Sequence, residues 1–271
     1  MGLAETKYPT KFAHRCVVSL AVGHQFEKLW EYNRMERGLD FIREDLQKSD
    51  FSGDYIPYRQ RLPFGSPTHA DAPFAFKPFC LQECIESGYT SILWLDSSIR
   101  IHGRIDALFD FIEADGYLIF REFNQMSTLG EYCADGALNA LGLTRDCSFS
   151  IPICWGAAIG IDINSLLGVE FQREWLRHAK ERTAFTGPKW SGVYGWPATA
   201  STDRRVHGHR WDQTVASVLA WRLGMRNWQE RAVFDRYLKN DRLAVRRYSE
   251  WKDDNFLKKM WRKLRGIGPG F

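Results

Sequence analysis

The chain has 271 residues, of which 44% are hydrophobic and 26% charged, and its formal net charge is +4. This is an ordinary globular composition, long enough for one large domain or two small ones. No run approaches the roughly 18 apolar residues of a membrane span, and MGLAETKYPTKFAHR lacks the apolar centre of a signal peptide. We therefore expect a cytoplasmic protein, and its six scattered cysteines, none in a CxxC pair, to be free thiols.

The first predicted element is a strand over residues 15–22, followed by Gly23 and a helical pattern. Strand, glycine and helix together can bring backbone N–H groups to a ligand, although a plain tight turn explains the same pattern. Further helices are expected at 39–46, 76–88, 105–112, 165–183 and 211–223, and strands at 91–95, 116–123 and 150–163, the last as one strand or two.

Two irregular connections, 50–73 and 186–204, interrupt this alternation, and residues 225–248 suggest a strand or short helix with edge elements. The alternation of strands and helices predicts one α/β sandwich with a mostly parallel central sheet flanked by helices.

A polar turn follows the predicted strand 91–95. Asp96, Ser97 and Ser98 come directly after five mostly apolar residues. Ligands of open α/β sheets bind beyond the carboxyl ends of the strands, and a carboxylate with hydroxyls can hold a hard cation there. The simpler interpretation is a turn in which Asp96 bonds its own backbone.

Two other segments carry candidate functional residues. Lys77 lies at the N-terminal edge of a predicted helix, where the helix dipole disfavours a cation, so either an anionic partner or plain solvation explains it. His207, His209 and Asp212 cluster at the start of the helix 211–223. A backbone-bonded histidine and a helix-capping aspartate explain this second cluster without any chemistry.

Taken together, these segments resemble the nucleotide-sugar glycosyltransferases of the GT-A fold. Lys77 and LWLDSSIRI (93–101) are similar to the basic helix and the DxD turn of that family. CWGAAIGID (154–162) is similar to its small-residue donor/acceptor turn, and HRWDQTVASVLA (209–220) to its DQ helix. The resemblance covers roughly residues 15–225, and it departs from the family at Ser98, which stands where the second Asp of DxD would be.

The resemblance implies a single GT-A-like (Rossmann-like) domain, residues 1–250. It implies transfer of a sugar from a nucleotide-diphosphate sugar, with a UDP-sugar favoured, to a glycan, a lipid-linked acceptor or another hydroxyl, as in polysaccharide biosynthesis. It also implies Mn²⁺ or Mg²⁺, although Ser98 puts metal dependence in doubt. The expected donor-binding residues are Val22, Gly23, Lys77, Asp96, Ser97 and Ser98, and the expected sugar or acceptor residues are Trp155, Gly156 and Trp190. The expected metal ligands are Asp96, Ser98 and His209. The expected catalytic residues are Asp96 and, as general base, Asp212.

Two other classes compete with this interpretation. One is a non-catalytic nucleotide- or carbohydrate-binding module with a degenerate turn. The other is a phosphotransferase of the haloacid-dehalogenase type, which needs a second Asp two residues after the first, where this chain has Ser98. Release of a nucleoside diphosphate from nucleotide sugars separates the transferase from a binding module. We expect no nucleic-acid partner.

The segment 251–271 is predicted to be a basic amphipathic tail. Its net charge of +4 equals that of the whole chain, so residues 1–250 are neutral overall. Such a helix can lie on an anionic membrane surface, or its apolar face can pack on the domain. Peripheral membrane association is therefore one of two expectations for this segment.

Overall fold

The computed structural model describes residues 14–21, 29–122, 128–189 and 199–240. The strands are β1 (Arg15–Ala21), β2 (Asp54–Arg59), β3 (Ser91–Leu95), β4 (Ile99–Ile101), β5 (Tyr117–Arg121), β6 (Cys154–Asp162) and β7 (Leu238–Asn240). The α-helices are α1 (Leu29–Lys48), α2 (Phe76–Glu86), α3 (Asp106–Asp115), α4 (Asp135–Ala140), α5 (Arg145–Ser148), α6 (Leu166–Glu181), α7 (Trp211–Arg222) and α8 (Arg231–Tyr237). None of these described helices combines the length and apolar content that a bilayer-spanning segment requires.

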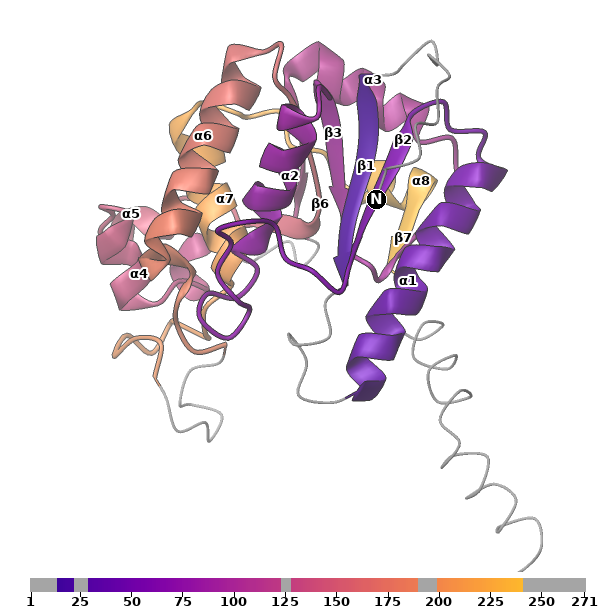
Figure 1. The fold of residues 1–271 in the computed structure, drawn as a ribbon. Coiled ribbons are helices and arrows are strands. Elements are labelled where there is room, and N and C mark those ends of the chain that lie inside the picture. Colours follow the sequence, from indigo (N-terminus) through magenta and orange to yellow (C-terminus); the bar gives the residue numbers. More distant parts are fainter. Residues whose placement is uncertain (1–13, 22–28, 123–127, 190–198, 241–271) are drawn as a thin grey trace, which may run out of the picture.

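A five-stranded sheet in the order β2-β1-β3-β6-β5 forms the centre of the described fold (Figure 1). β1 pairs in parallel with both β2 and β3, whereas β6 is antiparallel to β3 and to β5. Four of the five strands therefore point the same way. The predicted α/β class with a mostly parallel sheet is confirmed.

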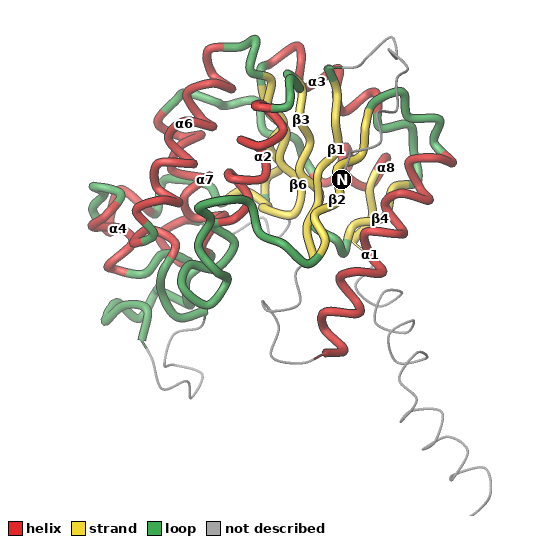
Figure 2. The backbone as a smooth tube through the Cα atoms, viewed as in Figure 1, coloured by secondary structure: helices red, strands yellow, loops and turns green. Residues whose placement is uncertain are grey.

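Helices cover both faces of the sheet (Figure 2). Because side chains alternate along a strand, β1 and β3 contribute to two separate cores. Cys16, Val18, Ile92 and Trp94 pack with α2, α6 and α7, while Val17 and Leu93 pack with α1 and α3 on the other face. The order β2-β1-β3 reverses direction at β1, and a crevice at such a switch point is where α/β sheets bind ligands.

Two predictions about local structure were wrong. The expected second helix at 39–46 is the continuation of α1, whose Gly38 lies so close to the turn after β3 that an added Cβ would stand 1.8 Å from the Ser97 carbonyl oxygen. The connection 50–73 contains β2, whose Pro57 pairs with Ser19. Since β2 is an edge strand with only one paired side, it tolerates a proline.

A second, two-stranded sheet joins the C-terminal part of the described chain to the turn after β3. β4 pairs antiparallel with β7, so Leu238 lies opposite Ile101. The predicted tail, 251–271, lies outside the described residues. The described chain ends at Asn240 of β7, which pairs with Ile99 directly after the 96–98 turn.

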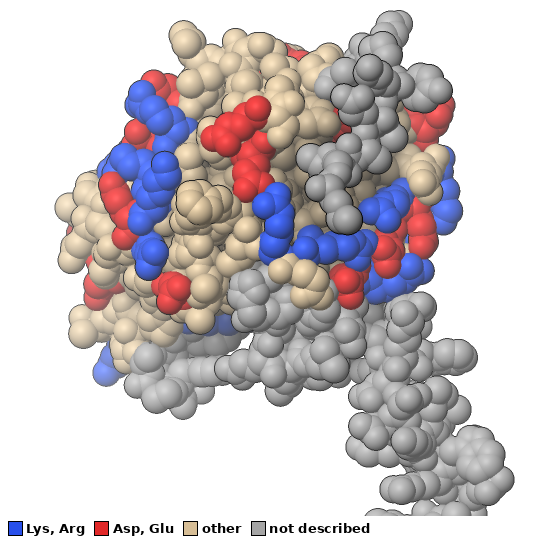
Figure 3. Space-filling view, in the orientation of Figure 1, with Lys and Arg blue, Asp and Glu red and all other residues tan. Residues whose placement is uncertain are grey.

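Surface charges on the face seen in Figure 3 are interspersed rather than grouped by sign. Over α1, Arg37 lies within ion-pair distance of Asp40 and Glu44, and Arg59 of β2 contacts Asp40 at 2.5 Å. These pairs are at least a quarter exposed, so each contributes little to stability.

Candidate functional site

Four segments meet at the carboxyl end of β3. These are the turn after β3, the first turn of α2, the start of β6 and the first turn of α7. The backbone N–H of Asp96 donates to the Ala157 carbonyl at 2.8 Å, which ties the turn to β6. The antiparallel direction of β6 is what brings its beginning, rather than its end, to this edge of the sheet.

The side chain of Lys77 lies at the centre of this meeting point. Its Nζ donates to the Gly156 carbonyl at 2.8 Å and to Asp212 Oδ2 at 2.6 Å, and it pairs with Asp96 Oδ1 at 3.0 Å. Three partners use the three N–H bonds of an ammonium group. Burial lowers the pKa of Lys77, but the charges of Asp212 and Asp96 outweigh burial, so the pKa is raised and the side chain stays protonated.

Asp96 is the accessible member of this cluster. Its Oδ1 accepts the indole N–H of Trp94 at 2.8 Å as well as the Lys77 contact, and 27% of its side chain is exposed. Trp94 and Asp96 stand two residues apart and so point to the same side of the sheet, toward α2. The carboxylate is thus oriented by a strand residue and a helix residue while part of it faces outward.

The two serines of the turn lie deeper than Asp96. Ser97 and Ser98 are both buried, and the Ser97 hydroxyl contacts the Met35 sulfur at 2.7 Å. The close approach of Gly38 accounts for this burial, because α1 covers the turn there.

Asp212 is the buried carboxylate of the cluster, with 6% of its side chain exposed. Burial raises the pKa of Asp212 to about 6; the nearby charge of Asp96 also raises this pKa, while Lys77 opposes the rise. One ammonium group faces two carboxylates, so the cluster carries a net negative charge when both are ionised. The carboxyl group of Asp212 therefore binds its proton more tightly than it would in water.

Gly156 allows α7 to approach β6 at this point. A Cβ added to Gly156 would lie 2.6 Å from Asp212 Oδ2 and 2.9 Å from Gln213 Cγ. Any larger residue would push the Asp212 carboxylate away from Lys77. Gly156 was expected to let the backbone come close to a ligand. In the structure, the group that comes close to the Gly156 backbone is the Asp212 carboxylate.

Gln213 links the start of α7 to the neighbouring strands. Its Nε2 donates to the Cys154 carbonyl at 3.1 Å and to Glu122 Oε2 at 3.2 Å. Neither Gln213 nor Trp94 was predicted as a site residue. The sequence signal for them lay in the motifs already quoted, since Trp94 stands two residues before Asp96 in LWLDSSIRI and Gln213 is the Gln of the DQ helix.

The expected metal ligands were Asp96, Ser98 and His209. His209 is fully buried, and its Nδ1 accepts the Ala134 N–H at 3.3 Å. Burial lowers the pKa of His209 to about 4, although a backbone group of Ala184 raises it. The ring is therefore neutral at pH 7 and packed in the protein core.

A divalent cation does not fit the donor groups present. Within the described ranges, no group of three or more His, Cys, Asp or Glu side chains is placed to hold a metal ion. The two carboxylates that do meet, Asp96 and Asp212, both contact the ammonium of Lys77, so a cation already stands between them. Since Ser98 replaces a carboxylate and is buried, only Asp96 remains as an accessible acidic ligand.

The structure does not bring Trp155 to the same face as this cluster. Its indole is buried among residues of α3 and α8, with the ring of Phe234 edge-on at 4.5 Å and 85°. Val22, Gly23 and Trp190 lie outside the described residues. Lys77, Asp96, Gly156 and Asp212 are the predicted site residues that meet directly.

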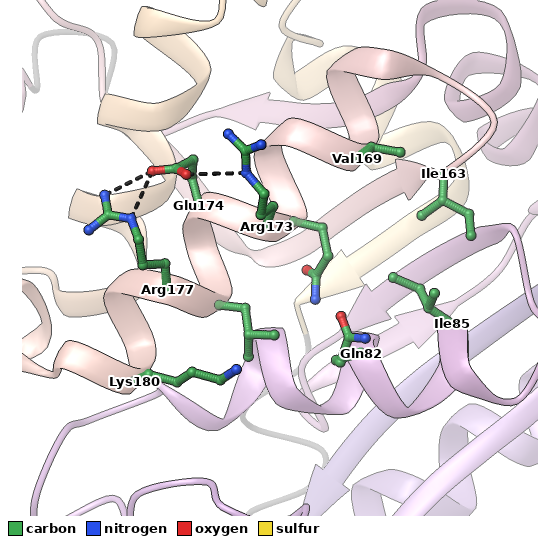
Figure 4. A pocket seen from close by; sticks show the side chains of 10 residues that line it. Gln82, Ile85, Ile163, Val169, Arg173, Glu174, Arg177 and Lys180 are labelled. Carbon is green, nitrogen blue, oxygen red and sulfur yellow. Dashed lines mark hydrogen bonds and ion pairs between the residues drawn. The ribbon is translucent and has the colours of Figure 1, made fainter.

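A large pocket of about 570 Å³ lies elsewhere, between α2 and α6 (Figure 4). Apolar side chains such as Ile85, Ile163 and Val169 line it, and Arg173 and Arg177 at its rim both pair with Glu174. Ile163 follows the end of β6, at the sheet edge opposite to Asp96. Arg173 and Arg177 are paired with neighbouring carboxylates, so this pocket is a weaker candidate for chemistry than the Lys77 cluster.

No protein-family profile matches the sequence, and no curated protein matches it. Three solved structures are similar in part. One is a glycosyltransferase involved in the glycosylation of the major capsid of PBCV-1, at 14% identity and a TM-score of 0.37, covering 60% of this chain and 66% of that chain. The bifunctional glycosyltransferase WbbM has 9% identity and a TM-score of 0.34, over 70% of this chain and 41% of its own.

The third, the galactosyltransferase LgtC in complex with donor and acceptor sugar analogs, has 10% identity and a TM-score of 0.31, over 82% of this chain and 99% of its own. These three structures are all described as glycosyltransferases, and their likeness is low enough that the function of this chain is argued from its own residues.

Proposed function

We propose that this chain is a glycosyltransferase that moves a sugar from a nucleotide-diphosphate sugar, a UDP-sugar in the favoured case, to a hydroxyl of a glycan or lipid-linked acceptor. The observation that supports it best is the meeting of three residues at the side-chain nitrogen of a fourth. The four residues come from four distant segments of the chain, and each was a candidate from the sequence. Asp96, Gly156 and Asp212 all contact the ammonium group of Lys77.

The reaction has a simple balance of bonds. An oxygen of the acceptor forms a bond to the anomeric carbon of the sugar, and the bond from that carbon to the diphosphate breaks. The nucleoside diphosphate leaves with the electron pair, and the acceptor proton passes to a base. Asp96 is the accessible carboxylate of the cluster, so we assign it the contact with a substrate hydroxyl and give Asp212 a positioning role instead of that of general base.

Lys77 is also a positioning residue in this proposal. Its ammonium is buried and shared between Asp96 and Asp212, so it acts through those carboxylates. A carboxylate paired with an internal ammonium attracts hydrogen-bond donors such as sugar or ribose hydroxyls, and it repels phosphate.

The test is Asp96→Asn in an assay that measures nucleoside diphosphate released from a panel of nucleotide sugars in the presence of glycan acceptors. Loss of a contact made in the transition state costs on the order of 3 kcal/mol, so we expect about a hundredfold slower release. The melting temperature should change little, because Asp96 is partly exposed. Asp110→Asn, at the opposite edge of the sheet, is the matched control and should release diphosphate at the wild-type rate.

Chelator separates two roles of Asp96. We expect activity to persist in excess EDTA, since Asp96 binds a hydroxyl. Activity that is lost with EDTA and restored by Mn²⁺ would assign Asp96 to a cation instead. A wild-type protein that binds nucleotide sugars and releases no diphosphate would be a binding module, and the proposed transfer would be rejected.

A further inference from the structure

Two aromatic residues next to the cluster have unusual backbone conformations. Phe74, just before α2, has φ of +62°, and Trp211, the first residue of α7, has φ of +39°. Their rings lie 5.7 Å apart, tilted by 42°, and both side chains are half-buried. Together they form an aromatic corner, the name used below for the side chains of Phe74 and Trp211.

Residues other than glycine rarely adopt positive φ, and bulky side chains least of all. Such strain persists where the surrounding structure holds it, and it gathers at functional sites. Here the Phe74 N–H donates to His69 Nδ1 at 3.3 Å, and the Trp211 indole N–H donates to the Gly187 carbonyl at 3.0 Å. These bonds hold the backbone of Phe74 and the indole of Trp211, and the His69 ring packs edge-on against the Phe74 ring at 4.6 Å.

The corner lies beside the accessible carboxylate. Lys77 Nζ is 5.1 Å from the centre of the Phe74 ring and 3.0 Å from Asp96 Oδ1. Trp211 directly precedes Asp212, whose carboxylate contacts the same nitrogen. Phe74 and Asp96 are therefore both neighbours of Lys77 Nζ, and this shared neighbour is the observation that connects the corner to the carboxylate. The ligand that enters here meets flat aromatic surfaces and a group that only accepts hydrogen bonds.

These two features suit a pyranose ring. The C–H face of a sugar carries slight positive charge and packs on the negative face of an aromatic ring, while the hydroxyl rim donates to a carboxylate. A nucleobase would also stack, but its edge carries acceptors beside its donors, whereas each hydroxyl of a sugar can donate to the carboxylate. The chemistry of the corner and of Asp96 therefore favours a neutral sugar over a base or a phosphate.

We infer that Phe74 and Trp211 form the surface on which the reacting sugar ring stacks while its hydroxyls contact Asp96. The inference rests on the proposed function for the identity of the reaction, and on the geometry alone for the sugar. It gives the stacking role to Trp211 and Phe74, whereas the sequence pointed to Trp155, whose ring is packed against Phe234.

The experiment is saturation-transfer NMR, with aromatic protons of the whole protein irradiated and sugar C–H protons observed. The probes are UDP-glucose, UDP, and the methyl glycosides of glucose, galactose, mannose and N-acetylglucosamine. Signal on the methyl glycosides assigns the corner to an acceptor sugar, and signal on the glucose ring of UDP-glucose assigns it to the donor sugar. We expect one of these two patterns from the wild type.

Two variants remove the corner. Trp211→Leu and Phe74→Gly should each weaken the sugar signal about tenfold, which is the size of one aromatic contact. Glycine adopts the positive φ of residue 74 without strain, so Phe74→Gly keeps its backbone conformation and serves as the test if Trp211→Leu fails to fold. Phe64→Leu is the matched control, because Phe64 is 97% exposed on the same connection and should leave the signal unchanged.

The outcomes separate this inference from the proposed function. Sugar signal that survives in both variants overturns the corner, as does saturation that reaches only the uracil protons of UDP or no sugar at all. Diphosphate release is measured on the same samples. If diphosphate is released and the sugar signal is unaltered in the variants, the aromatic corner is rejected and the transferase activity stands. If the sugar signal depends on the corner but no diphosphate is released, the transferase activity is rejected and the sugar site stands.

Discussion

Among the described residues, two buried cations face carboxylates, at opposite ends of the strands of the central sheet. Arg15, at the start of β1, donates to Glu113 at 2.6 Å and to Asp110 at 3.2 Å. Lys77 of α2, near the carboxyl end of β3, pairs with Asp212 at 2.6 Å and Asp96 at 3.0 Å. Each cation faces more than one carboxylate, so the number of charges does not distinguish the two clusters.

The difference lies in access to water. Glu113 and Asp110 are 30% and 72% exposed, whereas Asp212 is 6% exposed. Burial raises the pKa of Glu113, but the hydrogen bonds from Arg15 outweigh burial and leave it below the usual value. For Asp212 burial prevails, and its pKa is raised to about 6. The Arg15 cluster is therefore a stabilising anchor, and the Lys77 cluster retains excess negative charge in a buried place.

The largest expected effect comes from removing each cation. Lys77→Met leaves two carboxylates together with no cation between them, and breaking a buried pair in this way costs about 3–5 kcal/mol of unfolding free energy. Arg15→Met should cost about 1–2 kcal/mol, because its carboxylates are already partly hydrated. Urea unfolding at pH 7 measures both.

A double variant sharpens this contrast. Lys77→Met with Asp212→Leu removes the buried anion together with its cation, so it should recover most of the stability lost in Lys77→Met, while diphosphate release stays low. Equal losses of stability in Lys77→Met and Arg15→Met would show that water access does not separate the two clusters.

Gly156→Ala gives the next largest effect. Its new Cβ would displace the Asp212 carboxylate, and overpacking of this kind costs about 1–3 kcal/mol. We expect this loss together with at least a tenfold slower release of diphosphate, since the Lys77 contacts would shift. Gly160→Ala is the control on the same strand: its Cβ would meet Ile112 at 2.4 Å, so it should lose stability and keep activity. Full activity of Gly156→Ala would count against the site.

The smallest effect concerns pH. The pKa of Asp212 is higher in the folded protein, about 6, than its ordinary value of 3.8, so the folded state binds this proton more tightly than the unfolded state. Raising the pH from 4 to 6 should therefore destabilise the wild type relative to Asp212→Asn, by on the order of 2 kcal/mol, with no further change above pH 7. Melting temperatures of the two proteins across this range measure the difference, and parallel curves would refute it.

Much of the fold could be predicted from the sequence because its signals are local. The apolar run at 91–95, the proline and glycine that bound α2, and the apolar spacing of α6 are each contained in one segment. Local signals failed where a distant residue decided the outcome. The helix expected at 39–46 is the continuation of α1, whose Gly38 approaches Ser97, and the irregular connection expected at 50–73 contains an edge strand that includes Pro57.

For the site, the sequence indicated candidate residues, and only tertiary structure decided what each of them contacts. Lys77, Asp96, Gly156 and Asp212 are far apart in the chain, and no spacing rule states that the ammonium would be shared by the other three. The alternation of side chains along β6 turned Trp155 to the opposite face, and the start of α7 placed Trp211 beside Phe74. The reason is physical: hydrogen bonding, burial and pKa depend on atoms within a few ångströms, and the chain brings those atoms together only when it folds.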